Sequence, residues 1–176
     1  MSAPAQIHVI TLCCTQKVRR RLALPSEPPT PLEPTTRLGN WYINLVHFGH
    51  QQLVLATSER SLLTVILPVR GLRETLEGNL RTAVGQLLPA LGIPAEIVSR
   101  ELAEMTPAVV APATNRRVLG SMNELAFHLG FRMERGGDPL VLALELSDTP
   151  MSAVGSKSYY GIPREVAREL LSSRRN

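Results

Sequence analysis

The stretch "NWYINLVHFGHQQLVLATSERSLLTVILPV", residues 40–69, decides the fold because it predicts three consecutive β-strands. Its first two strands are rich in β-branched and aromatic residues, and Gly49 supplies the special backbone angles of the tight turn between them. A third strand follows over residues 61–69, and Pro68 ends it. Both faces of this meander carry many apolar residues, which indicates that helices cover at least one side of the sheet.

The residues after the meander predict an antiparallel pair of helices. The first helix spans residues 71–92, and its apolar residues recur at steps of three and four: Leu72, Leu76, Leu80, Val84, Leu87 and Leu88. Gly92 and Pro94 stop this helix and start a second one over residues 94–105. "TPAVVAPAT", residues 106–114, is a short extended piece that is a candidate for a further strand.

Elements at the two ends of the chain complete the expected fold. Residues 7–15 predict a first strand, and residues 15–22 predict a short basic helix. Residues 24–37 form a proline-rich connector that can neither continue a helix nor pair regularly in a sheet. Residues 140–147 are ambiguous between strand and helix, and Pro139 as a first helical residue favours the helix. An amphipathic helix closes the chain.

Together these segments predict a single α+β domain over residues 1–176, with a small, mainly antiparallel sheet and with a helical hairpin and further helices packed on it. Apolar residues make up 44% of the chain and charged residues 19%, which is typical of a globular protein and excludes a disordered one. Aromatic residues make up only 4%, so the core must be aliphatic.

The cysteine pattern argues for a reducing compartment. Cys13 and Cys14 are adjacent, so on a strand they would point to opposite faces and a mutual disulfide would be strained. No metal site is expected, because the sequence lacks a C-x-x-C spacing or a Cys/His cluster. No secretion signal and no apolar run of about 20 residues is present, which predicts a cytoplasmic protein without a membrane span. No cofactor is expected, since phosphate-binding and dinucleotide-binding glycine motifs are absent.

Positive charge is concentrated near the start of the chain. The net charge is +4, and no acidic residue occurs before Glu27. The basic cluster consists of Lys17, Arg19, Arg20 and Arg21. Such a cluster predicts a surface that binds nucleic acid or another polyanion. Solubility alone is the alternative explanation.

The stretch "TNRRVLGSMNELAFHL", residues 114–129, predicts an amphipathic helix that is unusually polar. Its apolar stripe is formed by Val118, Met122, Leu125, Leu129 and Met133. Thr114 or Asn115 stands at the N-cap position. Gly120 costs about 1 kcal/mol relative to alanine inside a helix, so we expect another element to approach the backbone closely there.

Two kinds of site are conceivable on this helix. Side chains beside a helix N-terminus can cradle an anion, and the candidate ligands are Asn115, Arg116, Arg117, Ser121 and Asn123. Glu124 and His128 lie one helical turn apart, so they are candidates to share a proton as a catalytic pair or to hold a metal. The simpler interpretation of that pair is a surface ion pair.

Four motifs together resemble an uncharacterised bacterial family, a domain of unknown function. They are C-T-x-K at residues 14–17, G-x-W-Y at 39–42, T-N-R-x-V-L-G-S-M-N at 114–123 and P-M-S at 150–152. The resemblance implies a small intracellular bacterial protein, but it implies no reaction. It directs attention to residues 114–123, where the family's motif is densest.

Three functional hypotheses remain open from the sequence. The first is a binding or regulatory protein with a basic surface for nucleic acid or another anionic partner. The second is an enzyme directed at a phosphate or nucleic-acid substrate, for example a toxin-type nuclease, with Glu124 or His128 as general base. A role in a toxin–antitoxin or defence pair is compatible with either hypothesis. The third is a protein-interaction module that uses the helical hairpin.

Overall fold

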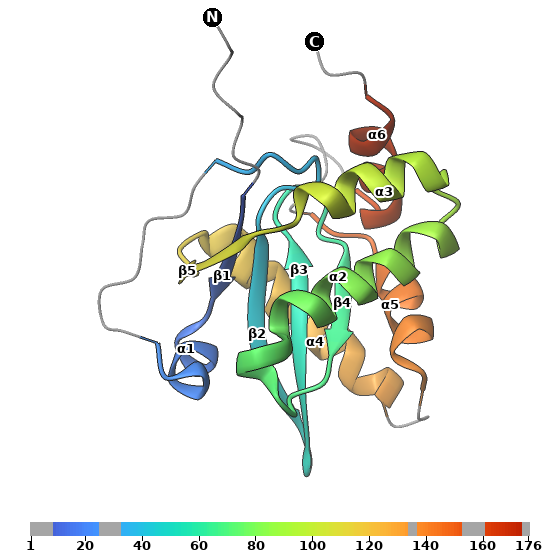
Figure 1. The fold of residues 1–176 in the computed structure, drawn as a ribbon. Coiled ribbons are helices and arrows are strands. Elements are labelled where there is room, and N and C mark those ends of the chain that lie inside the picture. Colours follow the sequence, from blue (N-terminus) through green and yellow to red (C-terminus); the bar gives the residue numbers. More distant parts are fainter. Residues whose placement is uncertain (1–8, 25–32, 134–136, 153–160, 174–176) are drawn as a thin grey trace, which may run out of the picture.

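The computed structural model describes residues 9–24, 33–133, 137–152 and 161–173, and it shows a five-stranded sheet between two layers of helices (Figure 1). The elements are, in chain order, β1 (Ile10–Cys14), α1 (Gln16–Leu22), β2 (Trp41–Phe48), β3 (Gln51–Ser58), β4 (Thr64–Leu67), α2 (Leu72–Ala90), α3 (Ala95–Glu104), β5 (Ala108–Pro112), α4 (Arg116–Met133), α5 (Pro139–Ser147) and α6 (Pro163–Ser172). The α+β class predicted from the sequence is confirmed. Most of the proline-rich connector lies outside the described residues.

The sheet joins the predicted meander to strands from distant parts of the chain. Its strand order is β4-β3-β2-β1-β5. Strands β2, β3 and β4 pair antiparallel, and Gly49 in the first turn has a φ of +57°. Strand β1 runs parallel to both β2 and β5. Parallel neighbours require long crossover connections. The connection from β1 to β2 runs through α1, and the connection from β1 to β5 runs from α1 through α3.

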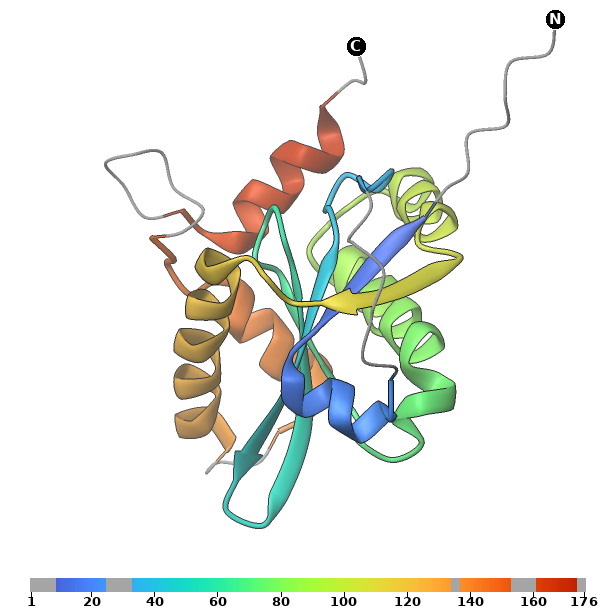
Figure 2. The same ribbon diagram turned by 90° about the vertical axis from the view of Figure 1, so that its left-hand side faces the viewer.

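Each face of the sheet has its own apolar core. One core joins the sheet to α1, α2, α3 and α6, and the other joins it to α4 and α5 (Figure 2). Trp41 and Tyr42 are neighbours on β2, yet both are buried, because successive side chains point to opposite faces and both faces are covered.

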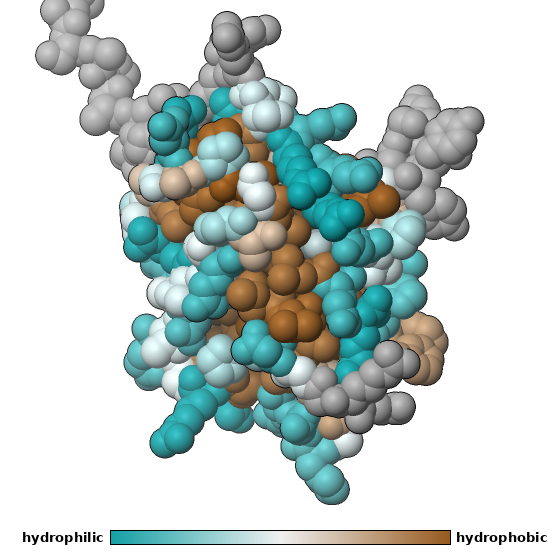
Figure 3. Space-filling model, turned by 90° about the vertical axis from the view of Figure 1, so that its right-hand side faces the viewer, coloured by the Kyte–Doolittle hydropathy of each residue, from teal (hydrophilic) through white to brown (hydrophobic). Residues whose placement is uncertain are grey.

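Residues 140–147 are helical, as part of α5, which answers the question of strand or helix left open by the sequence. This helix covers the edge strand β4. Asp138 caps it, because its Oδ1 accepts hydrogen bonds from the amides of Leu140 (2.8 Å) and Val141 (3.4 Å). Leu142 packs in one core and Ala143 in the other, so the helix covers the unpaired side of β4. Figure 3 shows apolar side chains at the surface of this side of the molecule, where α5 lies beside α2.

A buried carboxylate fastens the segment before β2 to helix α3. Glu101 is 2% exposed, and its two side-chain oxygens accept hydrogen bonds from the amides of Arg37 (3.0 Å) and Leu38 (2.9 Å). Burial is the main reason that the pKa of Glu101 is raised, and these two hydrogen bonds oppose that shift. Glu101 therefore has a structural role far from the polar stretch of α4.

Candidate functional site

The first turn of α4 is capped by its own chain. Asn115 Oδ1 accepts hydrogen bonds from the backbone nitrogens of Arg117 (3.1 Å) and Val118 (3.4 Å). This confirms the predicted N-cap and assigns it to Asn115. These two helix amides are thus already engaged by Asn115, so the positive charge that attracts an anion must come from side chains.

The start of α4 lies beside the start of α1 at one edge of the sheet. Strands β1 and β5 are parallel neighbours, and the amide of Ala113, just after β5, donates to the carbonyl of Cys14 at 3.0 Å. Helix α1 leaves β1 toward one face, where Val18 is buried, and α4 leaves β5 toward the other, where Val118 is buried (Figure 2). In open α/β sheets, ligands commonly bind outside the carboxyl ends of adjacent parallel strands whose helices leave toward opposite faces.

Most of the predicted cations at this edge are exposed to solvent. Lys17, Arg20 and Arg21 are exposed on α1, and their spacing of three and four residues places them on one side of the helix. Arg19 is half-buried, and its charge lowers the pKa of Cys14 against the larger effect of burial. On α4, Arg116 and Arg117 are both exposed.

Three other residues of the polar stretch lie in different environments. Ser121 is buried, and its hydroxyl donates to the carbonyl of Arg117 at 3.0 Å, so it faces its own helix. Asn123 is exposed. Apart from Gly120 itself, its two chain neighbours and the nearby backbone of α4, no atom of the described residues lies within 4 Å of the position that a Cβ would occupy on Gly120. The expected close approach at Gly120 therefore involves none of the described residues, because this residue lies on the outer side of α4, opposite the apolar stripe.

Glu124 and His128 do not form a pair. Glu124 is exposed and His128 is half-buried, and across the described ranges no hydrogen bond or ion pair joins the two side chains. The ring of His128 instead lies edge-on to Phe127, with ring centroids 6.1 Å apart. The part of the chain that the structure describes contains no cluster of three His, Cys, Asp or Glu residues that could hold a metal ion.

Nucleophilic side chains near this edge are buried and protonated. Burial is the main cause that raises the pKa of Cys13 to about 12 and the pKa of Cys14 to about 12. Burial also raises the pKa of Tyr42, although a hydrogen bond with the backbone of Asn115 opposes the shift. Both cysteines are free thiols. At neutral pH none of these groups is ionised, so none is an activated nucleophile.

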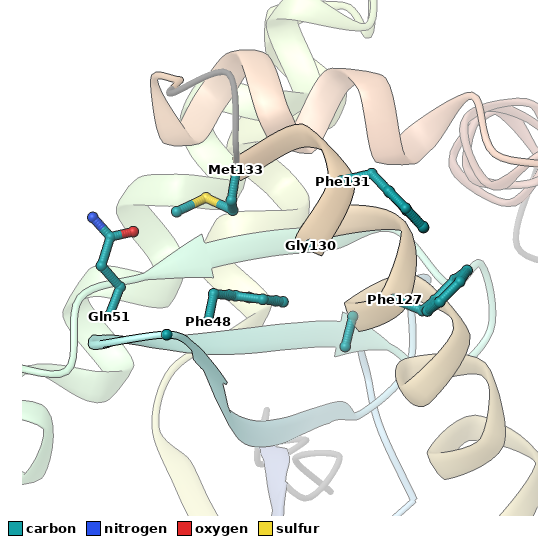
Figure 4. A pocket seen from close by; sticks show the side chains of 8 residues that line it. Phe48, Gln51, Phe127, Gly130, Phe131 and Met133 are labelled. Atoms are coloured by element: carbon teal, nitrogen blue, oxygen red, sulfur yellow. The ribbon is translucent and has the colours of Figure 1, made fainter.

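The structure also reveals an apolar groove at the other end of α4. It has a volume of about 570 Å³ and lies between α4 and the tip of the β2–β3 hairpin (Figure 4). The three phenylalanines of the chain, Phe48, Phe127 and Phe131, all line it. Phe127 and Phe131 are 65% and 59% exposed, and their rings lie edge to face with centroids 4.8 Å apart. Sequence reasoning missed this pair, although both residues stand outside the apolar stripe and one helical turn apart.

A comparison with protein families identifies the chain. The model of a domain of unknown function, DUF6933, matches residues 11–166. The chain belongs to this family. The match spans the whole sheet except Ile10, together with the N-terminal part of α6, and it includes both α1 and α4. No curated protein and no solved structure matches the chain. Among the helices that the structure describes, none has the length and apolar character needed to cross a membrane.

Proposed function

We propose that this protein is a non-enzymatic binding protein whose basic edge engages a polyanion, with nucleic acid as the first candidate. We define the basic edge as Lys17, Arg20 and Arg21 of α1 together with Arg116 of α4. The proposal is carried by one observation: α1 and α4 start from the paired ends of β1 and β5, so their exposed cations occupy the same edge of the sheet.

The charges of the basic edge are available to a ligand. Helix α1 contains no acidic residue. In the portions of the chain that are described, no ion pair involves any of the four cations, whereas Arg132 and Arg164 are paired with Glu145 and Asp148. A polyanion that meets unpaired guanidinium and ammonium groups releases its own condensed counterions, which favours binding at low salt.

Binding is favoured over catalysis by the state of the polar side chains. Cys13, Cys14 and Tyr42 are buried with raised pKa values, so they remain protonated at neutral pH. Among the described residues, no hydrogen bond or ion pair joins Glu124 and His128, so the proton-sharing pair on which the enzymatic hypothesis depended has no support in the geometry.

The test is the salt dependence of binding to single-stranded and duplex oligonucleotides. For wild-type protein, the logarithm of the affinity should fall linearly with the logarithm of salt concentration, by about 0.9 for each duplex phosphate neutralised. The triple substitution K17A/R20A/R21A should weaken binding and flatten this slope by about two to three. The matched control is R70A/R73A/R100A, which removes three exposed arginines near and on the α2–α3 hairpin and should leave the slope unchanged.

Two outcomes would contradict the proposal. One is the absence of binding to DNA and RNA at low salt. The other is an equal loss of slope in both triple variants, which would indicate a response to net charge and not to the basic edge. A separate substitution, R116A, tests whether α4 contributes to the same surface, and it should reduce the slope by about one.

A further inference from the structure

The two glycines of α4, Gly120 and Gly130, have different surroundings. At Gly130, a Cβ would lie 3.3 Å from the ring of Phe48, so the missing side chain lets the β2–β3 hairpin pack closely on the helix. At Gly120, a Cβ would meet nothing among the described residues. A helix-interior glycine without such a contact only destabilises the monomer. A close contact with another molecule would explain the glycine at position 120, as the contact with Phe48 explains the glycine at position 130.

Gly120 lies on the same side of α4 as the exposed aromatic pair. Phe127 and Phe131 follow it at seven and eleven residues, which are close to two and three turns of helix. These phenylalanines are the most exposed of the large apolar side chains in the described ranges. Arg117 and Glu124 flank this line on one side, and both are exposed without an ion-pair partner in the described parts of the chain.

We infer that this outer side of α4 is a self-association surface, which a second copy of the chain covers with its own α4 running antiparallel. The two-fold axis of the pair crosses the outer side of α4 at the level of Met122, whose own side chain is buried in the core on the opposite side of the helix. In that register Arg117 of each copy faces Phe127 of the other, and Gly120 faces Glu124. The absence of a side chain at Gly120 lets the two helix backbones approach near the axis.

A second copy of the chain fits this surface because Arg117 and Glu124 carry opposite charges. Phe127 and Glu124 are three residues apart on one helix face, so the guanidinium of the facing Arg117 would contact both an aromatic ring and a carboxylate. A two-fold axis makes every such contact twice, since residue i meets residue j and residue j meets residue i. Antiparallel helices also align their dipoles favourably.

This inference does not depend on polyanion binding. Helical geometry separates Arg117 from Arg116 by about 100° around α4. Arg116 precedes Phe127 by eleven residues and so borders the self-association surface. The tests keep the two proposals apart, because K17A/R20A/R21A changes α1 alone, whereas R117E and E124R change α4 and retain Arg116. Two copies joined through α4 would carry two basic edges on one particle. Failure of one proposal therefore leaves the other standing.

Charge exchange between full-length variants tests the proposal by sedimentation equilibrium. Wild-type protein should show a concentration-dependent monomer–dimer equilibrium. Each of the single variants R117E and E124R should be monomeric at the same concentrations, because like charges would then meet in both symmetric contacts. The double variant R117E/E124R should recover the dimer, and so should an equimolar mixture of the two single variants, because mixing restores both opposite-charge contacts.

Removal of an anchor gives a second, independent readout. F127A should weaken the dimer on the order of tenfold or more, as expected for a buried aromatic anchor. V141A, which truncates an exposed apolar residue on α5, is the matched control and should leave the dimer unchanged. Circular dichroism should show every variant folded, since each altered side chain is exposed. The proposal would be overturned if wild-type protein stayed monomeric over a 100-fold range of concentration. It would also be overturned if the R117E or F127A variant formed dimers as well as wild-type protein does.

Discussion

The side-chain oxygen of Asn115 lies 3.1 Å from the backbone nitrogen of Arg117, and it also accepts from Val118. One amide side chain thus satisfies two helix amides that would otherwise lack a partner inside the helix. The polar stretch at residues 114–123 therefore contains a structural residue as well as exposed cations. Substitution of Asn115 should therefore change the stability of the protein, whereas substitution of the exposed cations tests the proposed binding.

Replacement of Asn115 should test the cap directly. We expect N115A to lower the free energy of unfolding by about 1 kcal/mol, because both cap hydrogen bonds are lost. N115D should retain most of the stability, since a carboxylate accepts the same bonds and suits the positive end of the helix dipole. Urea denaturation measures both variants. A loss in N115D as large as in N115A would show that the cap geometry is not what stabilises this turn.

Replacement of Gly120 should stabilise the protein, whereas replacement of Asn115 should destabilise it. We expect G120A to raise the free energy of unfolding by about 1 kcal/mol, because alanine favours the helix and its methyl group meets none of the described residues outside the backbone of α4. The measurement is thermal or urea denaturation at a concentration low enough to keep the protein monomeric. G130A is the contrasting variant, and its methyl group would press on Phe48, 3.3 Å away. Equal effects of the two substitutions would contradict this account.

The two thiols should be unreactive in the native protein. With their pKa values raised to about 12 by burial, Cys13 and Cys14 carry almost no thiolate at pH 7, and neither is accessible. Incubation with a thiol reagent should modify neither residue before unfolding and both after unfolding in denaturant without reductant. Intact-protein mass spectrometry gives the count. Rapid modification of native protein would mean that the edge between β1 and β5 opens in solution.

Glu101 should make stability depend on pH in an unusual direction. Its pKa is raised above the ordinary value of 4.5, so the folded state binds the proton more tightly than the unfolded state does. The contribution of Glu101 to the free energy of unfolding should therefore fall as pH rises from about 4.5 toward the raised pKa, and it should be constant above that pKa.

The comparison of wild-type protein with E101Q isolates this effect from other carboxylates. The difference in unfolding free energy, wild type minus E101Q, should decrease with rising pH across that window. E96Q, on the exposed side of the same helix, serves as the control and should show a difference that does not change in this way. A difference that increases with pH would mean that the hydrogen bonds from Arg37 and Leu38 outweigh burial.

Local sequence patterns determined the elements of this protein. The alternation of residues 40–58 and the turn at Gly49 specify a hairpin, because side chains on a strand alternate between faces and the turn needs a positive φ. The spacing of leucines in α2 and the capping residue of α4 were likewise readable, since helix periodicity and end effects act within a few residues. Adjacent cysteines on a strand were correctly expected to face opposite sides.

Only the tertiary structure decided which elements meet. The parallel pairing of β1 with β2 and β5 joins residues about 30 and 100 apart in the sequence, and no local pattern encodes such a contact. That pairing brings the basic helix α1 beside the start of α4. The packing of α4 on the sheet leaves Gly120 without a contact among the described residues and places Phe127 and Phe131 at the surface, because the layers packed around α4 cover only one of its sides. The sequence alone showed which residues of α4 are polar, apolar or glycine, whereas the exposure of these residues depended on how the rest of the chain packs around the helix.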